Sequence, residues 1–161
     1  MLIGILSDTH NNVRRTIDAL NIFKECGVGI VLHVGDITSV DMLALFNGFN
    51  AKFVFGNEDK NQEELNNESL SLGFGLIERQ LVFEVDGKKF IMFHGFDVPF
   101  FRECVASSYY DYIIKGHTHF FENYISNKSR IINPGALHGA YEFTIATLDT
   151  ETDKVEMIVI E

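Results

Sequence analysis

The sequence predicts an α/β fold, with two layers of β-sheet and outer helices in one domain spanning residues 1–161. Up to residue 55, short apolar runs alternate with helical periodicity, which is typical of parallel strands joined by crossover helices. Beyond residue 75, strand-like runs predominate, and turns separate most of them. The chain has 161 residues, 46% of them hydrophobic, which is enough for one domain with its own core.

The first part of the chain is expected to follow the order β-α-β-α-β. Asn11 or Asn12 is the expected N-cap of the first helix, and Gly27 is its expected end. The second helix should run from Ser39 to Phe46. Buried strands are expected at 2–6, 30–34 and 52–55.

The second part should begin with a surface helix at about 62–70, for which Asp59 is the favoured N-cap; the alternative is that Asp59 hydrogen-bonds to a histidine ligand. Asp86-Gly87 then predicts a hairpin turn between strands at 76–85 and 89–93. A helix should start near Asp97 and Pro99 and end near Ser107, before a strand at 111–115. We expect the last four strands to form an antiparallel set that is interrupted at Pro134-Gly135: 120–125, 130–133, 141–148 and 155–160.

Composition excludes several classes of function. The net charge of −10 opposes binding to a nucleic-acid backbone. No apolar run approaches the length of a membrane span, and no basic segment precedes the first apolar stretch, so we expect a cytoplasmic protein without a membrane partner. Cys26 and Cys104 are far apart and are expected to be free thiols.

Aspartate, asparagine or histidine residues follow five of the predicted strands. In open α/β sheets, functional sites lie beyond the carboxyl ends of the strands, so these side chains should meet at one edge. Asp, Asn and His at five separate strand ends are hard to explain by packing alone. The seven candidate ligands are Asp8, His10, Asp36, Asn57, His94, His117 and His119.

Seven ligands suit two metal ions that share one carboxylate, for which Asp36 is the best placed. Imidazole with carboxylate favours Mn²⁺, and also Ni²⁺, Fe²⁺, Zn²⁺ or Co²⁺, over Ca²⁺. Two such ions can activate a water between them and hold a phosphoryl oxygen. A structural zinc site is the weaker alternative, because such a site needs only four ligands and prefers cysteine.

The motifs Asp-x-His, Gly-Asp, Gly-Asn, His-Gly and Gly-His-x-His resemble those of the calcineurin-like metallophosphoesterase family, in the same order, from Asp8 to His119. The chain looks most similar to the small single-domain bacterial and archaeal phosphodiesterases of that family. Asn133-Pro134-Gly135 resembles a turn in those small members.

The resemblance implies a four-layer α/β/β/α sandwich, with two mixed sheets flanked by helices, and a dinuclear centre. It implies hydrolysis of a small phosphorylated substrate, a diester rather than a monoester, by in-line attack of a metal-bridging hydroxide. Asp36, Asn57 and His94 would act in catalysis through that hydroxide. Transferred by position, one ion takes Asp8, His10, Asp36 and His119, and the other takes Asp36, Asn57, His94 and His117.

The chain departs from the family pattern at two positions. Many larger members have a histidine after the Asn of the third motif, placed to protonate the leaving group, but this chain has Glu58. A glutamate beside two cations should be ionised and a poor proton donor, so no general acid is assigned. Ala136 stands where small members often have serine, which affects only minor phosphate contacts.

Three alternatives compete with this hypothesis. The same fold serves as an interaction scaffold in a trafficking-coat subunit, and Glu58 is compatible with such a role. An aspartyl phosphatase with Asp8 as nucleophile would need Asp where the chain has His10, and it leaves the later histidines unexplained. A dinucleotide site is excluded because no glycine-rich turn follows the first strand. The acidic stretch 63–68 and the C-terminal strands are two candidate contacts in a homo-oligomer.

Other polar and aromatic residues have ordinary explanations. His33 is interpreted as a buried histidine with satisfied hydrogen bonds, and His138 as a loop residue that could reach the cleft. Asn11 and Asn12 are caps first and phosphate contacts second. Cys104 is expected to pack in the core. Five aromatic residues are expected mainly in the core, with a substrate wall as the alternative: Phe96, Phe100, Phe101, Tyr109 and Tyr110.

Overall fold

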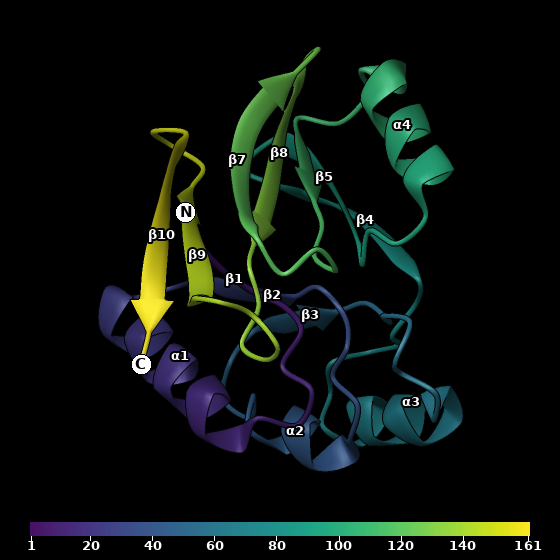
Figure 1. Cartoon of the computed structure of the whole chain (residues 1–161), viewed down its shortest axis with the longest axis vertical. Helices are drawn as coiled ribbons and strands as arrows, with labels where there is room; N and C mark the ends of the chain where they lie inside the picture. Colours follow the sequence, from purple (N-terminus) through teal and green to yellow (C-terminus); the bar gives the residue numbers. More distant parts are fainter.

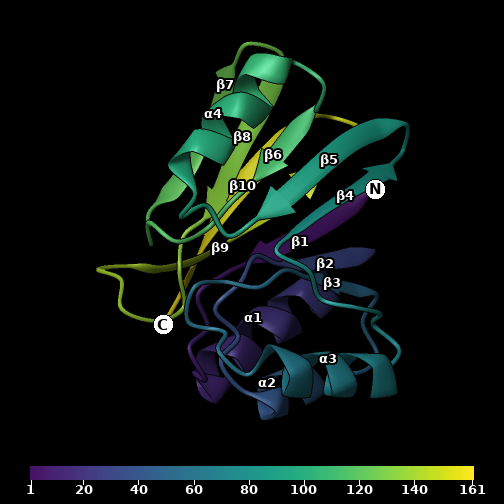
Figure 2. The same ribbon diagram turned by 90° about the vertical axis from the view of Figure 1, so that its right-hand side faces the viewer.

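The computed structural model describes residues 1–161 and has four layers in the order α/β/β/α (Figure 1, Figure 2). Three helices cover the outer face of the first sheet: α1 (Val13–Cys26), α2 (Val40–Ala44) and α3 (Gln62–Ser71). Helix α4 (Val98–Ser107) covers the outer face of the second sheet. This arrangement confirms the expected α/β sandwich of two mixed sheets flanked by helices. No helix combines the length and the apolar character that crossing a membrane requires.

The first sheet has the strand order β10-β9-β1-β2-β3. Strands β1, β2 and β3 are parallel, and β9 and β10 add an antiparallel hairpin to the free side of β1. The parallel part is the β-α-β-α-β order that the sequence predicts. The strand bounds are β1 (Leu2–Leu6), β2 (Ile30–His33), β3 (Ala51–Phe53), β9 (Phe143–Asp149) and β10 (Lys154–Ile160).

The second sheet has the order β4-β5-β6-β8-β7, in which β5, β6 and β8 are parallel. The prediction of one antiparallel C-terminal set is therefore wrong. The four strands form two hairpins, β7–β8 and β9–β10, that belong to different sheets, because the chain leaves the second sheet after Pro134 and then pairs with β1. The bounds are β4 (Gln80–Val85), β5 (Lys88–Phe93), β6 (Tyr112–Ile114), β7 (Phe121–Ser126) and β8 (Ser129–Pro134).

Three apolar clusters hold the layers together. The largest, with 17 buried residues, lies between the first sheet and its helices, and includes Leu6 and Phe23. A cluster of 13 joins the two sheets and includes Ile3 and Ile5. Side chains alternate along a strand, so β1 supplies both clusters. A smaller cluster of five fixes α4 to the second sheet.

Most element ends agree with the sequence. The Asn12 side chain accepts a hydrogen bond from the Arg15 N–H at the start of α1, and Gly27 ends that helix in the left-handed conformation. The two-residue turn at Asp86 and Gly87 links β4 to β5. Strand β4 begins later than expected, at Gln80, and β3 ends earlier, at Phe53.

Candidate metal centre

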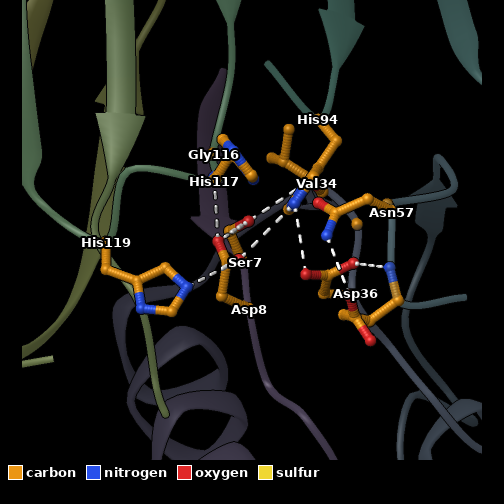
Figure 3. Close-up of polar contacts among 12 residues, drawn as sticks. Ser7, Asp8, Val34, Asp36, Asn57, His94, Gly116, His117 and His119 are labelled. Atoms are coloured by element: carbon orange, nitrogen blue, oxygen red, sulfur yellow. Dashed lines mark hydrogen bonds and ion pairs between the residues drawn. The ribbon is translucent and has the colours of Figure 1, made fainter. Parts of the chain in front are cut away.

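The seven predicted ligands all follow the carboxyl ends of strands, on one edge where the two sheets meet. Figure 3 labels all of them except His10. Asp8 and His10 follow β1, Asp36 follows β2, and Asn57 follows β3. His94 directly follows β5 in the second sheet, and the segment after β6 carries His117 and His119. The two sheets thus contribute different ligand types, carboxylates from the first and most of the imidazoles from the second.

Asp8 is fully buried, and its two carboxylate oxygens have different surroundings. Oδ2 accepts hydrogen bonds from the Ser7 hydroxyl at 2.6 Å and from the His117 backbone N–H at 3.1 Å. Oδ1 lies 3.1 Å from His119 Nε2, 3.6 Å from His94 Nε2 and 3.9 Å from His10 Nε2. One oxygen therefore fixes the carboxylate, and the other faces three imidazoles.

Asp36 shows the same division. Its Oδ1 accepts a hydrogen bond from the Glu58 backbone N–H at 2.8 Å. Its Oδ2 lies 3.3 Å from His10 Nε2 and 3.2 Å from His94 Nε2. Burial by itself would raise the pKa of Asp36, but the two imidazoles outweigh it and hold that pKa well below its ordinary value. Asp36 is therefore a carboxylate, with one oxygen between two histidines.

The buried Nε2 atoms of His10 and His94 have no hydrogen-bond partner. Both lie near Asp36 Oδ2, but the contacts lack the direction of a hydrogen bond. Buried polar atoms without partners are rare, and nitrogen lone pairs beside carboxylate oxygens are what a divalent cation requires. Two groups could each enclose one ion: Asp8, His10 and His119, and Asp8, Asp36 and His94.

Two backbone carbonyls orient the imidazoles. His94 Nδ1 donates to the Val34 carbonyl at 2.7 Å, and His119 Nδ1 donates to the Gly139 carbonyl at 3.1 Å. A neutral imidazole that donates through Nδ1 presents the lone pair of Nε2, the atom that both histidines direct toward Asp8. The pKa of His94 is lowered by burial, but the carboxylates of Asp36 and Asp8 reverse this and raise it overall.

Two predicted ligands lie at the edge of this group. The exposed His117 ring meets the His94 ring edge to face, with centroids 5.1 Å apart. Asn57 is exposed, and its amide donates to the Glu58 carboxylate at 3.1 Å. No hydrogen bond or ion pair joins either side chain to Asp8 or Asp36, whereas the other five are linked directly through these two carboxylates.

Five of the seven predicted ligands have a left-handed backbone. Such a conformation in a non-glycine residue costs on the order of 1–3 kcal/mol and is concentrated at functional sites. The φ angles are 54° at Asp8, 39° at His10, 57° at Asp36, 71° at His117 and 62° at His119. The strand ends are therefore bent in order to direct these side chains inward.

Two glycines permit close approach of the chain to the carboxylates. A Cβ on Gly56 would overlap the Asp36 carboxylate, and a Cβ on Gly116 would overlap the Ser7 hydroxyl that fixes Asp8. Positions 56 and 116 therefore require glycine, because there is no space for a side chain.

Asp59 does not have the capping role that the sequence predicts. It does not cap α3, whose N-cap position is Asn61. Its buried carboxylate instead accepts three backbone N–H groups, from Asp36, Thr38 and Gly56. Burial raises the pKa of Asp59, and the three donors oppose that shift. Asp59 therefore joins the segments that carry Asp36 and Asn57.

Two further residues that sequence reasoning passed over support the centre. Ser7 donates its hydroxyl to Asp8, as described above. The buried amide of Asn133 donates to the Gly116 carbonyl at 3.0 Å and to the Thr118 hydroxyl at 2.9 Å, which fixes the loop of His117 and His119. For Asn133, the signal in the sequence was the Asn133-Pro134-Gly135 motif.

The remaining histidines differ in role. His33 is fully buried: its Nδ1 accepts from the Gly35 N–H, and its Nε2 lies 3.0 Å from the Thr9 hydroxyl. Burial lowers the pKa of His33 to about 3, in agreement with its interpretation as a satisfied buried histidine. His138 is exposed, and its ring lies 5.0 Å from the ring of His10. It therefore reaches the rim of the centre.

Of the aromatic residues for which a core position or a substrate wall is expected, three pack in the core and one lies beside the candidate ligands. Phe100, Phe101 and Tyr110 pack against the cluster under α4, as expected for core residues. Phe96 instead stands beside His94 and His117, with 48% of its surface exposed. Cys104 is buried in the α4 cluster, where burial raises the pKa of its thiol to about 11, so it is a packing residue.

Comparison with known proteins agrees with this geometry. Residues 1–153 match the model of the calcineurin-like phosphoesterase superfamily domain. Over 174 aligned residues, the chain is 32% identical to Phosphodiesterase MJ0936 of Methanocaldococcus jannaschii, with full coverage of both proteins.

Solved structures with the same fold include two phosphoesterases and a Vps29 protein. A structure described as a novel archaeal phosphodiesterase has a TM-score of 0.93 at 31% identity, with 99% of each chain covered. Yfce, a phosphoesterase from E. coli, has a TM-score of 0.73 at 16% identity with full coverage. Vps29 from Entamoeba histolytica, complexed with zinc, has a TM-score of 0.70 at 17% identity over 99% of each chain. The last two show the fold alone.

Proposed function

Because this chain belongs to the calcineurin-like phosphoesterase superfamily, we propose that it is a metal-dependent phosphodiesterase whose active site is the cluster around Asp8 and Asp36. One observation carries the proposal. The buried Nε2 atoms of His10 and His94 have no hydrogen-bond partner, and both lie beside the same oxygen of Asp36. That arrangement leaves the nitrogens unsatisfied unless a cation binds them.

We propose two divalent ions, with manganese the first choice and nickel, iron, zinc or cobalt as alternatives. Asp36 would be shared, since its Oδ2 lies between one histidine of each set. The first set would be Asp8, His10, Asp36 and His119, and the second Asp36, Asn57, His94 and His117.

When bound, such ions lower the pKa of a coordinated water and neutralise charge on a phosphoryl group. The protein's own residues provide the orientation. The Val34 and Gly139 carbonyls hold the protons of His94 and His119 on Nδ1, away from the centre. Ser7 and the backbone of Glu58 each occupy one carboxylate oxygen, so that the other oxygen of Asp8 and of Asp36 faces inward. The site is therefore organised in advance for an oxyanion substrate.

The scaffold alternative is not favoured. The similarity to Vps29 proteins is below 20% identity and concerns the fold, whereas the 32% identity over the full length is to a phosphodiesterase. A scaffold would also have no need for five strained backbone positions around two buried carboxylates.

The test is hydrolysis of bis-p-nitrophenyl phosphate and p-nitrophenyl phosphate after chelation and reloading with Mn²⁺, Ni²⁺ or Mg²⁺. Metal-restored turnover should be lost in Asp36→Asn and His94→Ala and kept in Asp18→Asn, a surface carboxylate on α1. Metal analysis should give two ions per wild-type chain. Absence of turnover with every metal in a folded protein would contradict the proposal and favour the scaffold.

We further propose that the chain acts as one domain in the cytoplasm. The free thiols of Cys26 and Cys104 suit a reducing compartment.

A further inference from the structure

We propose that a cleft beside Asn57 binds one ester arm of the substrate, and that this arm is a nucleotide: a planar base on a sugar that carries a second phosphate. The inference rests on the proposed phosphodiesterase function and specifies its substrate class. It is carried by the position of the cleft, by one exposed aromatic ring and by one unpaired cation.

The cleft has a volume of about 390 Å³ and opens directly beside the metal centre. Its lining includes Gly56 and Asn57, from the segment after β3, together with Phe96, Lys60 and Arg79. Sites for small organic ligands have volumes of roughly 300–1,000 Å³, so the cleft is large enough for part of a substrate whose phosphorus lies at the metals.

Phe96 gives the cleft an aromatic wall. Its ring lies 6.1 Å from the ring of His117 and 6.2 Å from that of His94, measured between centroids. Almost half of its surface is exposed, unlike that of Phe93, which is buried under α4. An aromatic side chain held at the mouth of a polar site is suited to stacking against a planar group, and nucleobases stack with little dependence on their identity.

Three charged side chains line the cleft: Lys60, Arg79 and Asp59, whose carboxylate is occupied by three backbone N–H groups. Lys60 is already paired with Glu58, at 3.2 Å. Arg79 is exposed and forms no ion pair, although the chain has a net charge of −10 and acidic groups are abundant. A free guanidinium presents several N–H donors in a geometry that matches a phosphate. Arg79 is therefore the group that would bind a second phosphate on the sugar of this arm.

The experiment varies one ester arm and keeps the leaving group constant. The three substrates are methyl p-nitrophenyl phosphate, p-nitrophenyl thymidine 5′-phosphate, and the same thymidine ester with a 3′-phosphate. All release p-nitrophenol, so their ratios of kcat/KM report recognition of the other arm. Wild-type protein loaded with metal should prefer the thymidine ester over the methyl ester by about tenfold or more, and the 3′-phosphate should add to that preference.

Two variants assign the preference to the cleft. Phe96→Ala should reduce the thymidine preference about tenfold, the change that 1.4 kcal/mol of base stacking represents, and Phe96→Tyr should restore it. Arg79→Gln should remove only the gain from the 3′-phosphate. The matched controls are Tyr124→Ala and Arg14→Gln, which replace an exposed tyrosine on β7 and an exposed arginine on α1 and should retain both preferences.

Binding of thymidine 3′,5′-bisphosphate, measured by calorimetry on metal-loaded protein, tests the nucleotide cleft separately from the phosphodiesterase activity. If no ester is hydrolysed, the phosphodiesterase proposal fails. In that case the nucleotide cleft is still supported if wild type binds the bisphosphate more tightly than Phe96→Ala and Arg79→Gln do. If esters are hydrolysed but neither variant changes the preferences or the binding, the nucleotide cleft is overturned while the phosphodiesterase remains.

Discussion

Asp59 accepts a hydrogen bond from the backbone N–H of Asp36 at 2.9 Å, although the two residues are 23 positions apart in the chain. The same carboxylate accepts the Thr38 and Gly56 N–H groups, both at 2.7 Å. One buried side chain thus fixes the left-handed turn that directs Asp36 inward and ties it to the segment of Asn57. The proposed shared ligand is therefore held by its backbone as well as by its side chain.

Asp59→Asn should weaken both stability and metal binding. The amide NH₂ would face an N–H donor, which leaves buried donors unsatisfied and costs about 1–3 kcal/mol of unfolding free energy. Loss of such a supporting contact should also lower metal affinity about 10–100-fold. Urea unfolding and metal titration measure the two effects. Asp111→Asn is the control, because that exposed carboxylate accepts one N–H group, from Lys89, which an amide oxygen can also accept. Equal effects of the two variants would refute the special role of Asp59.

Gly56→Ala should disable the centre, because the added methyl group has no space. Its Cβ would overlap the Asp36 carboxylate, so either Asp36 or the segment of Asn57 must move. A displacement of about 1 Å at such a site costs roughly a hundredfold in turnover. Gly29→Ala is the control, because its Cβ would meet the flexible Met1 side chain 3.2 Å away. Turnover of bis-p-nitrophenyl phosphate measures both, and near-normal activity of Gly56→Ala would show that the close approach is dispensable.

Leaving-group dependence should be steep, because the protein has no evident proton donor at Glu58. The Glu58 carboxylate accepts from the Asn57 amide at 3.1 Å and pairs with Lys60 at 3.2 Å, so it is engaged as an acceptor. Turnover should fall strongly from p-nitrophenyl to phenyl and alkyl esters. Glu58→His introduces a group that can donate a proton and should make this dependence shallower. A flat dependence in the wild type would mean that another group protonates the leaving oxygen.

His33 should make the protein less stable in mild acid. The pKa of His33 is lowered to about 3 in the folded state, whereas the unfolded chain binds the proton below about 6.5. Between these values the unfolded state binds more protons, so the stability contributed by His33 is present above pH 6.5 and is lost as pH falls toward 3. Lowering pH from 7.5 to 5 should cost about 2 kcal/mol through this residue.

The measurement for His33 is urea unfolding of metal-free wild type and His33→Asn at both pH values. The Asn oxygen can accept the Gly35 N–H in place of Nδ1, and it carries no titratable group in this range. The wild type should lose about 2 kcal/mol more than the variant between the two pH values. Equal losses would mean that His33 is not kept neutral by burial.

The sequence by itself determined the α/β class, the order of the first five elements and most of the candidate ligands that meet around Asp8 and Asp36. Local patterns suffice there, since apolar runs end in Asp, Asn or His, and the carboxyl ends of parallel strands necessarily share an edge. The cap at Asn12, the stop at Gly27 and the turn at Asp86-Gly87 are likewise encoded within a few residues.

Only the tertiary structure decided what depends on contacts between distant segments. The division of the C-terminal hairpins between two sheets follows from the path after Pro134, which no local pattern specifies. Asp59 has the sequence context of a helix cap, but three backbone N–H groups from two separate strand ends occupy it. The cleft formed by Phe96 and Arg79 also joins separate segments. A buried carboxylate or an exposed ring acquires its role from what packs against it, and that is settled when the layers assemble.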